Sequence, residues 1–268
     1  MQFQSIFQVD AFTAEPFKGN PAGVMVVTEN ITTEQMQQLA MEMNLSETAF
    51  VFPQRDNLFE IRYFTPAKEV DLCGHATLAS AHILYETGRV ASDDQIHFKA
   101  KGADLTISKS DSWLEMNFPR YPLTKRAQHP DFEALVGFEP VELYDSSYNW
   151  VVAVANREDE VQNALPVFSA LTEAGLGHLM ITAPASTPEY DFVLRCFAPW
   201  AGIDEDPVTG SAHCALTPLW AEQLGKKQLT SLQVSKRTGI LKTELAGDHV
   251  IIKGQAVTVF KIELTINN

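Results

Sequence analysis

The stretch Arg62–Pro66 (RYFTP), followed by Gly74–Ala76 (GHA), indicates the architecture of this chain because it returns half a chain later. The second copy reads Arg195–Pro199 (RCFAP), followed by Gly210–Ala212 (GSA). The displacement is 133 residues for the first block (195 − 62) and 136 for the second (210 − 74), close to half of the 268 residues. We therefore expect two similar halves that bring both Gly-x-Ala turns to one central cleft, where a pseudo-symmetric enzyme would place its chemistry.

Short strand-like runs fill most of each half, with one long apolar helix expected per half at residues 75–85 and 211–224. A helix that is apolar on nearly all sides is a buried helix. Many strands around one such helix favour the α+β class with two pseudo-symmetric domains. Pro218 lies inside the second helix and should bend it or cost it a backbone hydrogen bond. No compensating feature is visible in the sequence.

The domain boundary is expected near residue 118. Residues 119–130 form a polar, proline-bearing stretch that we interpret as a linker. The expected domains are residues 1–118 and 119–268, and the last strand is a candidate to return to the first half.

Composition excludes several classes of function. The formal net charge of −14 argues against binding to nucleic acid or to an anionic membrane surface. No run approaches the roughly 18 apolar residues of a membrane span, and the N-terminus does not resemble a signal peptide. Three cysteines without a CxxC pair argue against a disulfide framework. These features predict a cytoplasmic protein.

The two Gly-x-Ala turns are the first candidates for a binding site. Free amides and the positive end of the helix dipole make a helix start attractive to anions, and Gly74 and Gly210 would let a ligand approach the backbone. The matched pair, with Ser211 in the second turn, predicts binding of a carboxylate or a developing enolate without a metal or cofactor. The alternative is that the glycines only ease tight turns.

Three ionisable residues are candidates for catalysis. Glu47 lies between apolar runs at the entrance to an expected strand, where shielding from water would suit a proton carrier; the alternative is an exposed glutamate at a strand edge. His75 follows Gly74, and the helix dipole there favours neutral imidazole. Asp206 is the acidic residue nearest the second turn. His82 and His213, inside expected helices, are assigned structural roles.

The cysteines do not form a matched pair at the two turns. Cys73 precedes Gly74, whereas Cys214 lies three residues beyond Ser211, so a symmetric two-thiol mechanism is not favoured. The sequence contains no HExxH, P-loop or Rossmann glycine pattern, so metal, nucleotide and nicotinamide chemistry are not indicated.

Together, these segments resemble the PhzF family of phenazine-biosynthesis isomerase-like proteins, which have the diaminopimelate-epimerase-like fold. The resemblance covers almost the whole chain and is carried by residues 9–12 (VDAF), 19–23 (GNPAG), 46–50 (SETAF), 62–66 (RYFTP), 72–77 (LCGHAT) and 205–212 (EDPVTGSA). It implies two domains, each a barrel-like, mostly antiparallel sheet around a central helix, with the site between them. It also implies no cofactor and a homodimer.

The resemblance also implies roles for single residues. A glutamate matching Glu47 moves a proton between two carbons of a cyclohexadiene acid in characterised members, assisted by residues matching His75 and Asp206. Asn20 and Ser46, in the matched segments, join Gly74, Gly210 and Ser211 as expected substrate-binding residues.

The first hypothesis is thus a cofactor-independent isomerase acting on a small unsaturated or amino-substituted carboxylic acid. An amino-acid racemase or epimerase is the second, and it would need two opposed bases. The third is a non-catalytic module that binds a metabolite or a protein partner.

Overall fold

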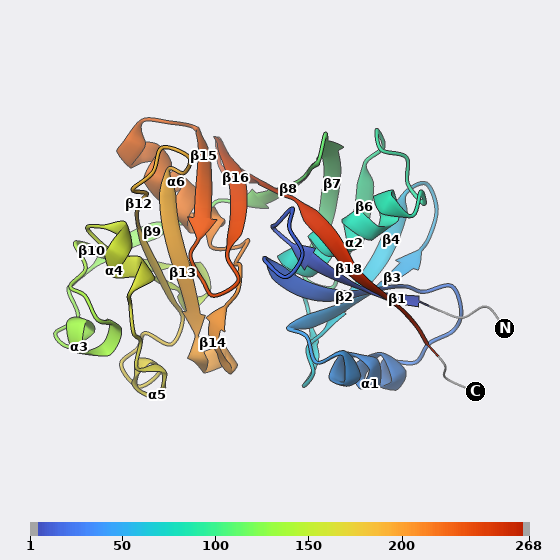
Figure 1. The fold of residues 1–268 in the computed structure, drawn as a ribbon, viewed down its shortest axis with the longest axis horizontal. Coiled ribbons are helices and arrows are strands. Elements are labelled where there is room, and N and C mark those ends of the chain that lie inside the picture. The colour runs from blue at the N-terminus through green and yellow to red at the C-terminus, as the bar shows by residue number, and fades with distance from the viewer. Residues whose placement is uncertain (1–4, 265–268) are drawn as a thin grey trace. The chain divides into compact units, whose positions relative to one another are not determined.

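The computed structural model describes residues 5–264, which form two compact units (Figure 1). One unit takes the described residues through Asn117 and those from Lys253 onward, and the other takes Phe118–Ile252. Strands dominate both units, and each has one long helix that is buried against its sheet. The molecule therefore has the mixed α+β fold that the sequence predicts.

The first unit is built from nine strands and two helices among the described residues. They are β1 (Ser5–Ala11), β2 (Asn20–Val26), α1 (Thr33–Met43), β3 (Glu47–Pro53), β4 (Leu58–Phe64), β5 (Glu69–Val70), α2 (Gly74–Glu86), β6 (Ile96–Lys99), β7 (Asp104–Ser110), β8 (Trp113–Pro119) and β18 (Ala256–Glu263). Strand β1 pairs antiparallel with both β2 and β18, so the last described strand pairs with the first.

The second unit repeats this plan with additional short helices. Its elements are β9 (Leu123–Arg126), α3 (Phe132–Val136), β10 (Glu142–Ser146), the 3₁₀ turn η1 (Ser147–Asn149), β11 (Val151–Val154), α4 (Glu158–Gln162), α5 (Phe168–Leu171), β12 (Leu179–Pro184), β13 (Phe192–Ala198), η2 (Pro199–Ala201), β14 (Ile203–Asp206), α6 (His213–Leu224), β15 (Gln228–Gln233) and β16 (Gly239–Ala246). Strand β17 (His249–Gly254) spans the residue at which the chain passes back to the first unit, as β8 spans the residue at which it leaves that unit.

The strand pairings show the internal duplication directly. In the first unit β2 pairs parallel with β3, β3 antiparallel with β4, β4 parallel with β6, and β6 antiparallel with β7. In the second unit β11, β12, β13, β15 and β16 repeat the same series of pairings. The first three residues of the repeated blocks, Arg62–Phe64 and Arg195–Phe197, lie on the corresponding strands β4 and β13. The repeat seen in the sequence is therefore a repeat of topology.

Helices α2 and α6 are the buried helices that the sequence predicts. Residues on every side of α2 are buried, and α2 contacts β1, β2, β3 and β18 (Figure 1). The start of α6 differs from the expectation, because the helix begins at His213 and not at Ser211. The first two amides of the helix bond to carbonyls three residues earlier, as in a 3₁₀-helix. His213 N–H donates to the Gly210 carbonyl and Cys214 N–H donates to the Ser211 carbonyl, each at 3.1 Å. Gly210–Ala212 therefore form a tight turn ahead of the helix.

Pro218 has a compensating partner that the sequence did not reveal. Its missing N–H would have bonded to the carbonyl of Cys214, four residues earlier. The backbone N–H of Tyr121 donates to that carbonyl instead, at 2.8 Å. The carbonyl that Pro218 leaves without a helical donor thus binds the backbone of another segment of the chain.

That segment belongs to the stretch expected to be a linker, and this expectation is wrong in part. Residues 119–130 contain β9, which pairs antiparallel with β10. None of these residues is buried, so their polar composition reflects exposure and not the absence of structure. Among the described residues, no helix is both long and apolar enough to cross a bilayer.

Candidate functional site

Glu47 is the first residue of β3, as the sequence predicts. In the parallel pairing of β2 with β3 it lies opposite Ala22, so Asn20, two residues earlier on β2, belongs to the same face of the sheet. Asn20 is fully buried, and Ser46 is partly buried just ahead of the strand. The Glu47 side chain is 15% exposed. The carboxylate is therefore shielded yet accessible, which rules out a fully solvated position at the strand edge.

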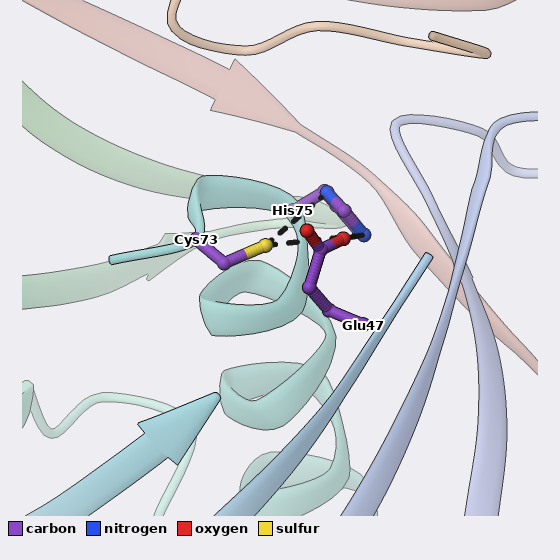
Figure 2. Close-up of side chains that lie close together, drawn as sticks. All are labelled: Glu47, Cys73 and His75. Carbon is purple, nitrogen blue, oxygen red and sulfur yellow. Dashed lines mark hydrogen bonds and ion pairs between the residues drawn. The ribbon is translucent and has the colours of Figure 1, made fainter. Parts of the chain in front are cut away.

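His75 and Cys73 bring two further polar groups to this carboxylate. Cys73 is the N-cap residue of α2 and His75 lies in its first turn. The Nε2 atom of His75 lies 3.3 Å from Oε2 of Glu47, and its Nδ1 atom lies 3.4 Å from Sγ of Cys73 (Figure 2). The imidazole thus stands between a carboxylate and a thiol.

Burial decides the charge of this imidazole. Removal from water lowers the pKa of His75 to about 4. The N-terminal end of the helix dipole disfavours imidazolium in addition. His75 is therefore neutral near pH 7. A carboxylate facing Nε2 favours the tautomer with its proton on that nitrogen, which leaves Nδ1 to accept from the Cys73 thiol.

Gly74, between these two side chains, is not required by packing or by backbone conformation. A Cβ atom built on Gly74 would meet nothing within 4 Å, and its φ is not positive. The residue is only partly buried. Neither packing nor a positive φ therefore explains a glycine at this position, and a ligand could approach the first amides of α2 here without meeting a side chain.

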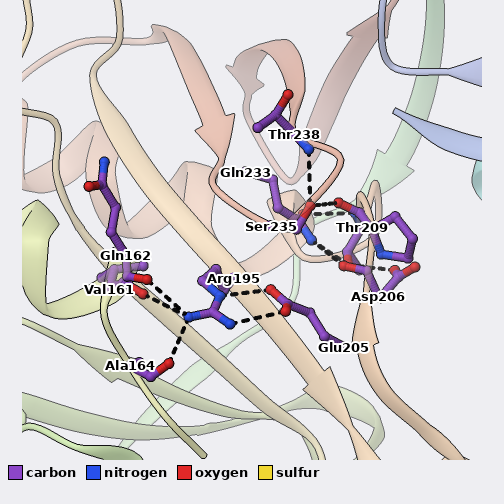
Figure 3. Close-up of polar contacts among 11 residues, drawn as sticks. Val161, Gln162, Ala164, Arg195, Glu205, Asp206, Thr209, Gln233, Ser235 and Thr238 are labelled. Carbon is purple, nitrogen blue, oxygen red and sulfur yellow. Dashed lines mark hydrogen bonds and ion pairs between the residues drawn. The ribbon is translucent and has the colours of Figure 1, made fainter. Parts of the chain in front are cut away.

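The corresponding region of the second unit is organised around Asp206, the last residue of β14. The hydroxyl of Thr209 donates to Oδ2 of Asp206 at 2.6 Å. Gln233 holds both residues through their backbones: its Nε2 donates to the Asp206 carbonyl at 2.7 Å, and its Oε1 accepts from Thr209 N–H at 2.8 Å (Figure 3). Thr209 therefore holds the Asp206 carboxylate, and Gln233 fixes the backbone of both residues.

An arginine–glutamate pair precedes the turn in both units. Arg62 makes two hydrogen bonds of 2.8 Å to Glu69, and Arg195 makes bonds of 2.7 and 3.0 Å to Glu205 (Figure 3). The displacement between the glutamates is 136 residues (205 − 69), the same as between the turns. Glu205 directly precedes Asp206, so this pair anchors the strand that carries the aspartate.

The structure thus brings Glu47 and His75 together and places Asp206 beside the turn of Gly210 and Ser211, where Gly210 is buried and Ser211 is exposed. The use of both sets on one substrate stays a prediction.

Sequence reasoning missed the contacts of Cys73, Thr209 and Gln233. The repeat offered a signal for Thr209, which precedes Gly210 as Cys73 precedes Gly74. It offered none for Gln233, which is more than twenty residues away along the chain. Both histidines assigned to structure are hydrogen-bonded: His82 Nε2 lies 3.1 Å from Thr258 Oγ1, and His213 Nε2 lies 2.6 Å from Ser231 Oγ.

Comparisons with known proteins agree with the duplicated fold. A family model described as "Phenazine biosynthesis-like protein" matches residues 9–262. An "uncharacterized isomerase" of Halalkalibacterium halodurans is 42% identical over 268 residues, covering 99% of this chain and all of the relative. The crystal structure of a PhzF-family protein from Enterococcus faecalis superposes with a TM-score of 0.93 at 37% identity, covering 99% of this chain and all of that one.

The fold extends to more distant proteins. The structure of a hydroxyproline epimerase from Agrobacterium vitis superposes with a TM-score of 0.61 at 10% identity, covering 98% of this chain and 92% of that one. This likeness concerns the fold alone. Taken with the match of the family model over nearly the whole chain, the comparisons show that this protein belongs to the phenazine biosynthesis-like (PhzC-PhzF) family.

Proposed function

We propose that this protein is an isomerase that moves a proton between two carbons of a small unsaturated or amino-substituted carboxylic acid, with Glu47 as the proton carrier. The observation that carries the proposal is the pairing of Glu47, 15% exposed, with the neutral imidazole of His75 at 3.3 Å. A shielded carboxylate beside a neutral hydrogen-bond donor can act as a base and then as an acid.

The chemistry balances within the substrate. Glu47 takes a proton from a carbon next to a double bond, and the electron pair of that C–H bond is delocalised through the double bond. The same proton returns to the carbon at the far end of the allylic system, so no electrons or atoms leave the substrate. This needs both carbons on the face of the substrate that meets Glu47, and little water, so that the proton is returned before it exchanges.

His75 and the start of α2 supply the remaining functions of this half. A neutral Nε2–H can hydrogen-bond to Glu47 without fixing it in a permanent ion pair. The open position at Gly74 lets a substrate carboxylate approach the first amides of the helix. These amides would stabilise the negative charge that develops when the proton is removed.

The proposal includes the residues of the second repeat. Asp206, held by Thr209 and Gln233, would assist proton transfer, and Gly210 and Ser211 would bind the substrate together with Asn20 and Ser46. It includes a cytoplasmic location, which the composition predicts, and a homodimer without a cofactor, which the family resemblance implies. The two repeats are proposed to serve one substrate.

Deuterium incorporation tests the role of Glu47. A panel of cyclic and acyclic unsaturated carboxylic acids is incubated with the protein in deuterated buffer and read by mass spectrometry. Glu47→Gln is expected to reduce exchange by at least about 100-fold, since removal of a general acid–base typically costs 10²–10⁴. Glu60→Gln, an exposed glutamate on β4, is the matched control. Full exchange in Glu47→Gln would remove Glu47 from the role.

The contact of Cys73 with His75 keeps an epimerase as the second candidate function. A thiol 3.4 Å from Nδ1 is a possible second proton carrier. The repeat places Thr209 and not a cysteine at the corresponding position, which favours the first function. Inversion of a stereocentre that is abolished by Cys73→Ala, with exchange in unsaturated acids absent, would favour the epimerase.

A further inference from the structure

The side chains of Glu47, Cys73 and His75 supply three different ligand types at one point. A carboxylate oxygen, a thiol sulfur and an imidazole nitrogen all lie within 4.8 Å of one another (Figure 2). The carboxylate comes from the start of β3, and the other two groups come from the start of α2. They therefore converge from two elements that the sheet and its central helix hold in place.

The separations approach those of a tetrahedral metal site. With Zn–S bonds of about 2.3 Å and Zn–N or Zn–O bonds of about 2.1 Å, tetrahedral ligand atoms stand about 3.4–3.6 Å apart. Oε2 of Glu47 lies 3.3 Å from Nε2 of His75, and Sγ of Cys73 lies 4.0 Å from the same nitrogen. The first distance already fits. The second needs a change of about half an ångström, which rotation of the Cys73 side chain can supply.

We propose that Glu47, Cys73 and His75 form a binding site for a borderline-soft divalent cation of the Zn²⁺ type. Sulfur and imidazole select such ions over Mg²⁺ and Ca²⁺, which take oxygen ligands. Three protein ligands leave the fourth position to water. On binding, the thiol proton of Cys73 passes to the solvent and the sulfur bonds to the metal as thiolate, while the His75 proton moves from Nε2 to Nδ1 and leaves the Nε2 lone pair for the metal. The formal charge of −14 on the chain favours the approach of cations.

The consequence for activity rests on the proposed function. A metal bound to the Glu47 carboxylate would occupy the oxygen that has to accept the substrate proton. The cation therefore acts as an inhibitor, and it makes the proposed isomerase sensitive to zinc through Cys73. This consequence is separate from binding itself, which depends only on the three side chains.

Titration with Co²⁺ tests binding without reference to activity. Co²⁺ replaces Zn²⁺ in sites of this kind, and a Co–thiolate bond adds a charge-transfer absorption in the near ultraviolet. Protein freed of metal by a chelator is expected to bind one Co²⁺ with this absorption, and to release it when Zn²⁺ is added. Mg²⁺ at the same concentration is expected to leave the spectrum unchanged.

The variant Cys73→Ser tests whether Cys73 supplies the thiolate ligand of the proposed metal site. This variant keeps Cys196 and Cys214, both fully buried, so loss of the charge-transfer band identifies Cys73 as the ligand. Serine also suits the N-cap position, so the variant is expected to fold, which circular dichroism checks. Glu47→Gln should weaken Co²⁺ binding at least 10-fold, and Glu60→Gln should leave it unchanged.

The outcomes separate the two proposals. No Co²⁺ binding at millimolar concentration, or a thiolate band that persists in Cys73→Ser, overturns the metal site whatever the enzyme does. If the metal site exists and the protein is the proposed isomerase, micromolar Zn²⁺ should abolish deuterium exchange in the native protein and inhibit Cys73→Ser at least 10-fold less. A protein that binds Co²⁺ through Cys73 and turns over none of the acids keeps the metal site and loses the proposed function.

Discussion

Replacement of Arg195 by methionine should destabilise the protein more than the equivalent change in the first repeat. The guanidinium of Arg195 makes two hydrogen bonds to Glu205, and its Nη1 donates to the carbonyls of Val161 at 3.2 Å and Ala164 at 2.9 Å (Figure 3). Its side chain is only 12% exposed. One arginine thus joins β13 to β14 and to the end of α4.

The magnitude follows from what the substitution leaves behind. Methionine retains most of the apolar stem, so the loss comes from the polar contacts. Glu205, 21% exposed, loses its bidentate partner, and buried carbonyls lose a charged donor. Breaking a fully buried pair costs about 3–5 kcal/mol, and partial access of water reduces this. We expect Arg195→Met to lower the free energy of unfolding by about 2–4 kcal/mol.

Arg62→Met is the matched control, since Arg62 holds Glu69 with the same geometry. The side chains of that pair are 25% and 31% exposed, and Arg62 makes one further bond, to Thr33 Oγ1 at 3.1 Å. A more solvated pair without buried carbonyls should contribute about 1 kcal/mol or less.

Urea denaturation followed by circular dichroism measures both variants. The double variant Arg195→Met/Glu205→Gln should recover part of the loss, because it removes the unpaired charge. Equal losses for Arg195→Met and Arg62→Met would refute the reasoning, since burial would then not decide the strength of the pair.

Three further predictions concern the helices and their histidines. Pro218→Ala should raise the free energy of unfolding by less than about 1 kcal/mol, well below the roughly 3 kcal/mol of an uncompensated helix proline, because Tyr121 already bonds to the freed carbonyl; urea denaturation checks this, and a gain near 3 kcal/mol contradicts it. Burial lowers the pKa of both His75 and His213 to about 4, so between pH 6.5 and 4 the unfolded chain binds protons that the folded protein does not. The free energy of unfolding should therefore decrease as the pH is lowered through that window, by about 1.4 kcal/mol per pH unit for each histidine; a denaturation midpoint that is the same at pH 7 and pH 5 would be evidence against neutral histidines in the fold. Cys73→Ser should stabilise the protein by about 0.5–1 kcal/mol, because a serine hydroxyl can cap α2 where the thiol makes no capping bond; a lower melting temperature in calorimetry would contradict this.

Local patterns in the sequence were sufficient for several elements of the fold. The capping box of Thr32 and Gln35 starts α1, and the apolar stretch after Gly74 forms α2 as predicted. The entrance of β3 at Glu47 was also predicted, because a strand pattern and the end of a helix meet there. Each of these depends on residues within a few positions of one another, so the sequence carries the information directly.

Other features required distant segments to be placed side by side. The sequence around β9 indicates a linker and not a strand, because the partner strand β10 lies beyond an intervening helix along the chain. The expected start of α6, residue 211, is two residues too early. The first amides of the helix bond to carbonyls three residues earlier, and no residue type in the sequence indicates this 3₁₀-type hydrogen bonding. Pro218 looked uncompensated because its substitute donor, Tyr121, is 97 residues away (218 − 121).

The sequence by itself determined that this chain is a duplicated α+β protein, with Glu47, His75 and Asp206 as candidates for catalysis. A repeat and a buried helix can be recognised from order and hydrophobicity alone. Only the tertiary structure decided that His75 stands between Glu47 and Cys73, and that Gln233 holds Asp206 and Thr209. Hydrogen bonds and ligand distances depend on side-chain positions to within half an ångström, and these are set by the packing of strands and helices that are far apart along the chain.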